Sequence, residues 1–188
     1  MSFTKTDLIQ KEALEKRYGS LNCPVQGPWN DVIGTIVSHR SVRSYKPNAL
    51  PDSTLETLTA AAQSAATSSN MQVWSLIAIT DQKKKIELAK IAGNQKHIEQ
   101  CPLFLVWLAD LSRSERVGNE EGVEMVVTPY VETFLVSAID AALAAQNAVI
   151  AAESLGLSTV YIGAMRNDPK QVGALLNLPP MVFPVFGL

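Results

Sequence analysis

Residues 131–156 constrain the fold of this chain more than any other segment, because they form one long run rich in alanine and leucine. At 3.6 residues per turn the run predicts a helix of about seven turns, closed by Gly156. Its length would suit a membrane span, but Asp140, Glu153 and two amide side chains lie inside it, and such groups are costly in lipid. We therefore expect a helix buried at the centre of a fold or in a subunit contact, with no membrane involved.

Helical periodicities and short apolar runs alternate along the rest of the chain. Strands are predicted over residues 72–80, 103–109, 158–163 and 182–188. Helices are predicted over residues 7–18, after Asn30, after a capping box of Ser53 and Glu56, over residues 81–93, and after Asp168 with Pro169 as the first residue. Residues 111–130 show no readable pattern. Strands separated by helices favour a parallel or mixed sheet with helices on both faces, in three layers of the α/β or α+β class.

Composition excludes several classes of protein. The chain has 188 residues, 47% of them apolar, which is enough for one domain with a real core. A net charge of −2 argues against a nucleic-acid coat protein or a polybasic membrane binder. The amino terminus carries charges throughout and has no secretory signal, so we expect a cytoplasmic protein. Leu188 falls inside an apolar run, and we therefore expect the natural domain to continue beyond it.

Few residues suit metal binding or nucleophilic catalysis. Cys23 and Cys101 are the only cysteines and His39 and His97 the only histidines, so one chain offers no disulfide framework, zinc thiolate site or multi-histidine centre. The cysteines are better explained as small core residues. The absence of GxGxxG, GxxxxGK[ST] and GxSxG motifs counts against nicotinamide-binding Rossmann, P-loop and α/β-hydrolase proteins.

The segment HRSVR at residues 39–43 gathers two guanidiniums, an imidazole and a hydroxyl, which together can clamp a phosphate. Basic residues at the end of a helix also face solvent and complement its dipole, and the residues alone leave both interpretations open. TSSN at 67–70, GNQ at 93–95 and YIGA at 161–164 are weaker candidates. The glycine of YIGA would let a flat ligand approach the backbone, but each of the three segments also fits an ordinary loop, turn or strand end.

Taken together, four segments resemble the FMN-dependent nitroreductase and flavin reductase family in their order and spacing. They are HRSVRSYKPNALPDSTLETLTAAAQSAATSSNMQVWSLIAITD, AGNQKHIEQCPLFLVWLAD, AAQNAVIAAESLGLSTVYIGAMRNDPKQV and LLNLPPMVFPVFGL. They are most similar to the oxygen-insensitive branch that prefers NADPH and reduces nitroaromatics, quinones or free flavin. The resemblance covers residues 31–188 as an FMN-binding domain and leaves residues 1–30 as an N-terminal extension of a helix and a loop.

The resemblance implies an α+β fold, with a mixed sheet flanked by helices in an intertwined homodimer that holds FMN at the subunit boundary. Residues 131–156 resemble the central helix of that dimer. The implied site holds no metal. The positions that match the family's FMN and substrate contacts are His39, Arg40 and Ser41 for the phosphate and ribityl chain, Arg43 beside the flavin N1, Thr67 and Ser68 reaching from the partner subunit, Ser69 and Asn70 on the substrate side, and Gln95, Tyr161, Ile162, Gly163 and Ala164 along the ring.

The implied mechanism is a two-step shuttle, in which NADPH or NADH gives hydride to the flavin and a second substrate then takes the electrons. Arg43 would favour the negative charge that collects near N1. Two departures matter: Ala164 stands where the branch usually has a second glycine, and the family continues past residue 188 into a segment that supplies a lysine and an arginine to the phosphate. The alternatives are a flavin-binding or scaffolding homodimer without turnover, and a phosphate or nucleotide sensor without flavin.

Overall fold

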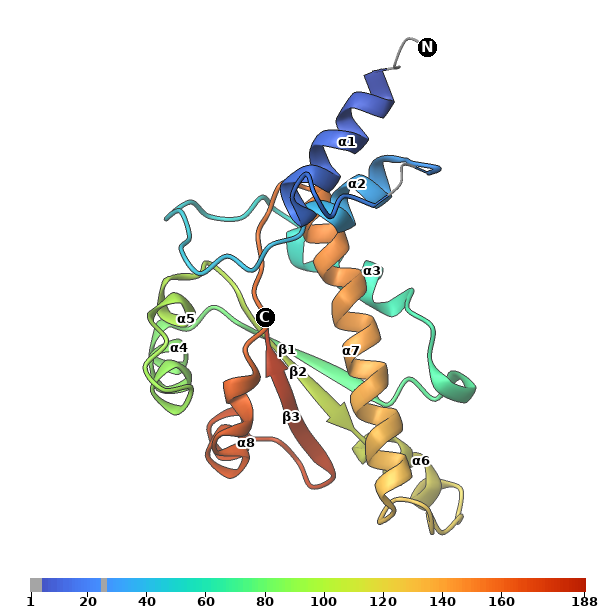
Figure 1. Cartoon of the computed structure of the whole chain (residues 1–188). Helices are drawn as coiled ribbons and strands as arrows, with labels where there is room; N and C mark the ends of the chain where they lie inside the picture. Colours follow the sequence, from blue (N-terminus) through green and yellow to red (C-terminus); the bar gives the residue numbers. More distant parts are fainter. Residues whose placement is uncertain (1–4, 25–26) are drawn as a thin grey trace.

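The structure is a computed structural model that describes residues 5–24 and 27–188; residues 1–4 and 25–26 of the predicted N-terminal extension lie outside the described part. It has three layers, with a small sheet between two groups of helices (Figure 1). On one face lie α3 (Thr54–Gln63) and α7 (Val131–Ser154), and on the other lie α4 (Gln82–Ile91), α5 (Lys96–Gln100) and α8 (Pro169–Leu176). The predicted α+β class and α/β/α layering are confirmed.

The sheet contains β1 (Trp74–Ile79), β2 (Phe104–Asp110) and β3 (Val182–Gly187), in the order β1-β2-β3. Both pairings are antiparallel, so the parallel or mixed pairing expected from the alternation of strands and helices is wrong for the described strands. The register explains the difference, because Ile79 at the end of β1 pairs with Phe104 at the start of β2. The connection through α4 and α5 therefore returns the chain to the end of the sheet that it left, and β2 runs back along β1.

Alternation along β2 supplies both layers of the core. Phe104, Val106 and Leu108 point to the face covered by α4, α5 and α8, whereas Leu105 and Trp107 point to α3 and α7. Every residue from Phe104 to Ala109 is buried, as a central strand covered on both faces requires. The sheet thus fixes the two helical layers relative to each other.

The long helix α7 confirms the strongest sequence prediction, and its length and composition alone would allow it to cross a membrane. Small residues bring it close to the sheet, and the buried alanines are Ala141, Ala144, Ala145, Ala148 and Ala152. A second stripe at a spacing of four residues is exposed; it consists of Val131, Leu135, Ile139 and Leu143, with exposed fractions from 44% to 80%. One apolar face of α7 therefore packs on the core, and another is left exposed by the described residues.

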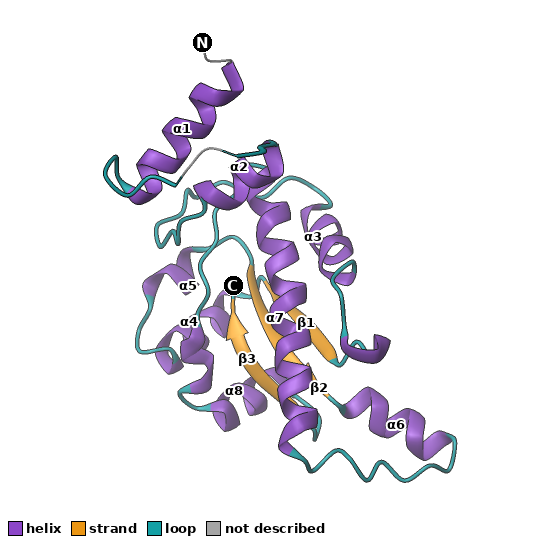
Figure 2. Cartoon of the chain, turned by 45° about the vertical axis from the view of Figure 1, so that its right-hand side comes forward, coloured by secondary structure: helices purple, strands orange, loops and turns teal. Residues whose placement is uncertain are grey.

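The remaining elements lie around this framework (Figure 2). They are α1 (Lys5–Tyr18), α2 (Asp31–Ser38), the 3-10 turn η1 (Ser68–Asn70), α6 (Ser112–Glu120) and the 3-10 turn η2 (Gly163–Arg166). α6 lies within the stretch that the sequence pattern left unassigned. Helix α1 contacts α2 beyond one end of the sheet.

The helix starts predicted near Asn30, Asp81 and Asp168 are confirmed, because each of these side chains accepts a backbone N–H from the first turn of the helix that follows. The capping box at Ser53 is wrong. Ser53 adopts a left-handed conformation with φ 60° and makes no side-chain cap, while the hydroxyl of Thr54 donates to the carbonyl oxygen of Pro51 at 2.6 Å.

The predicted strand at residues 158–163 is also wrong. Only Ile162 makes a ladder contact there, an isolated antiparallel bridge to Gly187, and η2 begins at the next residue. The strand assignment fails because the other residues of the segment have no neighbouring strand among the described residues with which to pair.

Candidate functional site

The segment at residues 39–43 leaves the end of α2 as extended chain. His39 has φ −51° and ψ 135°, which stops the helix, and the N–H of Val42 donates to the carbonyl oxygen of Thr159 at 3.0 Å. That bond ties the segment to the chain just before residues 161–164. Arg40, Ser41 and Arg43 are exposed and His39 is half-buried, so all four keep donors that a ligand could reach.

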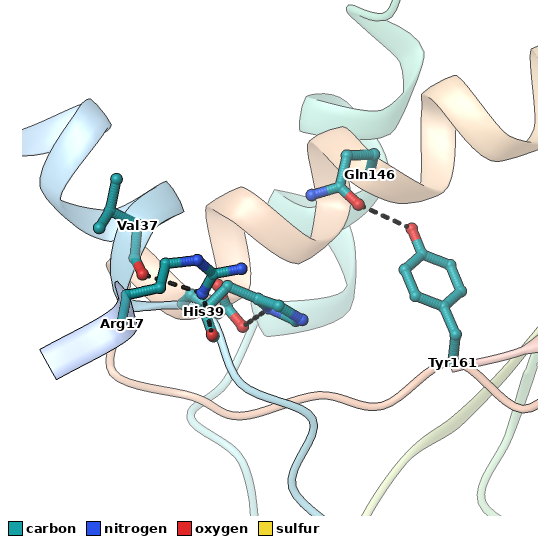
Figure 3. Close-up of polar contacts among 6 residues, drawn as sticks. Arg17, Val37, His39, Gln146 and Tyr161 are labelled. Atoms are coloured by element: carbon teal, nitrogen blue, oxygen red, sulfur yellow. Dashed lines mark hydrogen bonds and ion pairs between the residues drawn. The ribbon is translucent and has the colours of Figure 1, made fainter. Parts of the chain in front are cut away.

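The imidazole of His39 is held by a carboxylate on α7 (Figure 3). Its Nδ1 lies 2.6 Å from Oε1 of Glu153, so Nδ1 carries the proton of that hydrogen bond. The opposite ring nitrogen, Nε2, is then the one that Glu153 leaves free. Glu153 was missed as a site residue, and its only signal in the sequence was a carboxylate near the end of a strongly apolar helix.

Two cavities adjoin this segment, and Arg40 lines both of them. The larger, of about 590 Å³, is lined in part by residues between 40 and 51, Lys46 among them, and also by His97 and Ile162. The smaller, of about 320 Å³, is lined mainly by hydroxyl-bearing and charged side chains of α2, α7 and the following loop. Arg43 lines neither cavity, but it lies close enough to His97 to contribute, after burial, to a lowered pKa of that imidazole.

Residues 161–164 pack between α7 and the edge of the sheet. The ring of Tyr161 meets Phe186 edge to face at 5.0 Å, its hydroxyl donates to Oε1 of Gln146 at 3.3 Å, and burial raises its pKa to about 12. A Cβ at Gly163 would lie 3.0 Å from the guanidinium tip of Arg166, so a larger residue would require that flexible side chain to shift slightly. Ala164, next in the chain, is half-buried and packs against the core.

The two segments share one face of α7. Gln146, which binds Tyr161, and Glu153, which pairs with His39, are two helical turns apart, so their side chains project from nearly the same side of the helix (Figure 3). The structure therefore brings the predicted phosphate segment and the predicted ring segment together. Gln95 immediately precedes α5, and its side-chain amide donates to the carbonyl oxygen of Ala92 at 2.8 Å.

The loop at residues 67–70 lies elsewhere. The hydroxyl of Thr67 donates to the buried carboxylate of Asp140, and the N–H of Ser68 donates to the same carboxylate at 3.2 Å. Ser69 and Asn70 both have positive φ and are exposed. Asp140 was also missed as a site residue, although a carboxylate in the middle of an apolar helix was visible in the sequence.

More than three turns of α7 separate Asp140 from Glu153, which is about 20 Å along the axis and nearly half a revolution around it. Figures 1 and 2 both show the 68–70 turn and residues 39–43 on opposite sides of α7. Within one chain, Thr67, Ser68, Ser69 and Asn70 therefore do not join the site formed near Glu153.

Cys101 is unsuited to nucleophilic catalysis. Its thiol is buried and donates to the carbonyl oxygen of Ile98, and burial raises its pKa to about 11, which keeps it protonated at neutral pH. The neighbouring side chain of Lys85 is buried as well and donates to the carbonyl oxygen of Cys101 at 2.7 Å. The buried side chains of Lys85 and Cys101 therefore help to join α4 to the start of β2.

Comparison with known proteins gives one consistent result. The model described as "Nitroreductase family" matches residues 36–188. The FMN reductase (NADPH) of Bacillus subtilis is 45% identical over 160 residues, which cover 85% of this chain and 64% of that protein. The chain thus spans a little under two thirds of the length of this relative.

Solved structures agree. The NfrA1 nitroreductase of B. subtilis superposes with a TM-score of 0.81 and 44% identity, covering 83% of this chain and 64% of that one. The NADPH:FMN oxidoreductase of Vibrio harveyi, solved with NAD+, superposes with a TM-score of 0.79 and 39% identity, covering 84% of this chain and 66% of that one.

Proposed function

This chain belongs to the nitroreductase family, and from that premise we propose that it is an FMN-dependent NAD(P)H oxidoreductase that reduces nitroaromatics, quinones or free flavin. The observation that carries the proposal is the shared face of α7, where Glu153 holds His39 and Gln146 holds Tyr161. The segment with cationic and hydroxyl donors and the glycine-containing segment both contact this face, which supports a shared ligand site. The rival proteins, a flavin-binding dimer without turnover and a nucleotide sensor, become outcomes of the test below.

The residues present fit an FMN phosphate. Arg40 and Ser41 are exposed, Arg40 opens onto both cavities, and His39 keeps one ring nitrogen free of Glu153. Guanidinium, hydroxyl and imidazole groups are the donors that bind a phosphate dianion. We assign His39, Arg40 and Ser41 to the phosphate and ribityl chain.

The residues also fit a flat ring. Gly163 presents backbone without a side chain, and Tyr161, Ile162 and Ala164 flank it. Gln95 would contact the edge of the ring, and the exposed guanidinium of Arg43 would provide a fixed positive charge near N1. FMN, when bound, supplies the hydride chemistry, so the protein needs no nucleophile, in keeping with the protonated thiol of Cys101.

We propose a homodimer in which Thr67 and Ser68 of each chain approach the flavin of the other, with Ser69 and Asn70 on the substrate side. Two observations support it. The 67–70 loop is too far around α7 to reach the site of its own chain. In addition, α7 exposes the apolar stripe of Val131, Leu135, Ile139 and Leu143, which a second copy would cover. We place this dimer in the cytoplasm, with residues 31–188 as its FMN domain and residues 1–30 as an extension.

The test is optical. Purified protein supplied with FMN should be yellow and, without oxygen, should bleach on addition of NADPH or NADH, with the faster reductant identifying the preferred donor. A yellow protein that neither cofactor bleaches would be a flavin holder. A protein that stays colourless after FMN is added but binds another nucleotide would be a sensor, and either result would overturn the proposed activity.

A further inference from the structure

The helix α1 lies outside the part of the chain that matches the family model, which begins at residue 36. It nevertheless makes specific contacts with the described domain. Leu14 is buried, and the buried side chain of Gln10 donates to the carbonyl oxygen of Gly27 at 3.1 Å. The second contact ties α1 to the loop that precedes α2. Of the charged side chains of α1 whose burial the structure describes, most are exposed.

Arg17, in the last turn of α1, reaches the end of α2. Its Nη1 donates to the carbonyl oxygens of Val37 at 3.1 Å and His39 at 2.9 Å (Figure 3). The last carbonyl groups of a helix have no partners within the helix and carry partial negative charge. Arg17 therefore sits where the carboxyl ends of α1 and α2 converge, and a cation is favoured there by both.

The contact falls at the point where the chain leaves α2 for residues 39–43. His39 is held from two sides, because Arg17 binds its carbonyl oxygen and Glu153 binds its Nδ1. Among the described residues, the backbone that follows is next anchored at Val42, whose N–H donates to the carbonyl oxygen of Thr159. Arg40 and Ser41 thus lie between two anchored residues, His39 and Val42. Arg17 makes one of the two contacts that anchor His39.

We propose that Arg17 is a positioning residue for the phosphate-binding segment, and that α1 stabilises the cofactor site by holding the end of α2 in place. By fixing the carbonyl groups of Val37 and His39, Arg17 sets the direction in which the chain leaves α2, so that the donors of residues 39–41 converge on one anion. Preorganised donors bind more tightly because less ordering is left to occur on binding. The inference rests on the proposed function, since the anion is the FMN phosphate.

The experiment compares two ligands that share the ring and differ in the phosphate. FMN and riboflavin are titrated by flavin fluorescence into the parent protein and into Arg17→Ala. We expect the parent to prefer FMN, and Arg17→Ala to raise the FMN dissociation constant about ten-fold while changing that of riboflavin by less than about two-fold. Arg17→Lys, which can still donate to a carbonyl oxygen, should restore most of the preference for FMN.

Lys16→Ala is the matched control, because it removes the same charge one position earlier and Lys16 is exposed. It should bind both ligands as the parent does. Equal weakening of FMN and riboflavin by Arg17→Ala would show a purely structural role and overturn the inference, as would an unchanged preference for FMN. If Arg17→Ala does not fold, the same ratio measured in Arg17→Gln decides. A parent without preference for FMN would overturn the phosphate site itself, and the inference with it.

Discussion

Asp140 and Thr67 are joined by a hydrogen bond although 73 positions separate them in the sequence. The same buried carboxylate accepts the N–H groups of Ser68 at 3.2 Å and Val73 at 3.4 Å, and so fixes the loop that precedes β1 onto α7. A carboxylate with several such donors stabilises a loop that contains three non-glycine residues with positive φ: Ser69, Asn70 and Gln72.

Asp140→Ala should lower the free energy of unfolding by about 2–4 kcal/mol, because it leaves the N–H of Val73 and neighbouring donors without a partner in a buried place. Asp168→Ala, which removes a single helix cap on α8, should cost only about 1 kcal/mol and serves as the control. Denaturant unfolding measures both. Equal losses in the two variants would contradict this role of Asp140.

Arg43→Ala should leave FMN content unchanged and slow reduction by NADPH about ten- to a thousand-fold, the range for removal of one charge that stabilises a transition state. Anaerobic stopped-flow absorbance measures the rate. Arg116→Ala, which removes an exposed guanidinium paired only loosely with Glu120 on α6, should reduce at the parental rate. Parental kinetics in Arg43→Ala would remove that residue from the mechanism.

Two defective variants should complement each other if the site is shared between chains. Neither Arg40→Ala/Ser41→Ala nor Ser68→Trp should retain FMN well by itself. When the two are unfolded and refolded together, about a quarter of the sites should be intact, because half of the dimers are mixed and each mixed dimer has one undamaged site. Flavin absorbance after gel filtration gives the occupancy. No recovery on mixing, from variants that each refold alone, would argue for a site within one chain.

Acid should weaken the fold partly through His97. Burial, with a smaller contribution from Arg43, lowers the pKa of this imidazole below its ordinary value of 6.5. Between the lowered pKa of the folded protein and the ordinary pKa of 6.5 in the unfolded chain, the unfolded chain binds more protons. The stability that His97 contributes is therefore fully present above pH 6.5 and is lost as the pH falls from 6.5 toward the pKa of the folded protein. The thermal midpoint of the parent should drop more between about pH 7.5 and about pH 5 than that of His97→Gln. Parallel losses would rule out this contribution.

Local signals predicted much of the fold. The caps at Asn30, Asp81 and Asp168 and the buried strand β2 depend on residues a few positions apart, and all were read correctly. The strand predicted at residues 158–163 and the predicted direction of strand pairing were wrong, because strand formation depends on hydrogen bonds to a neighbouring strand that local sequence does not specify. Ile162 pairs with Gly187, whereas the residues before it have no strand beside them in the described part of the chain.

For the candidate site, too, local sequence predicted some features and missed those that depend on distant contacts. The residue types of HRSVR and YIGA suggested a phosphate and a ring, and the family resemblance assigned each position a role. The contacts that position these segments could not be predicted from the sequence, because His39 and Glu153 are 114 positions apart and Arg17 and His39 are 22 apart. Such pairings depend on the path of the whole chain, and no pattern of neighbouring residues reveals them.

The placement of Asp140 and Glu153 on opposite sides of α7 has a consequence for the protein in solution. If the groups that surround one flavin come from two chains, occupancy and assembly are linked equilibria: dilution that separates the chains would release the flavin, and added flavin would hold them together. Loss of the cofactor during storage at low protein concentration would then result from dissociation of the dimer and not from damage to either chain.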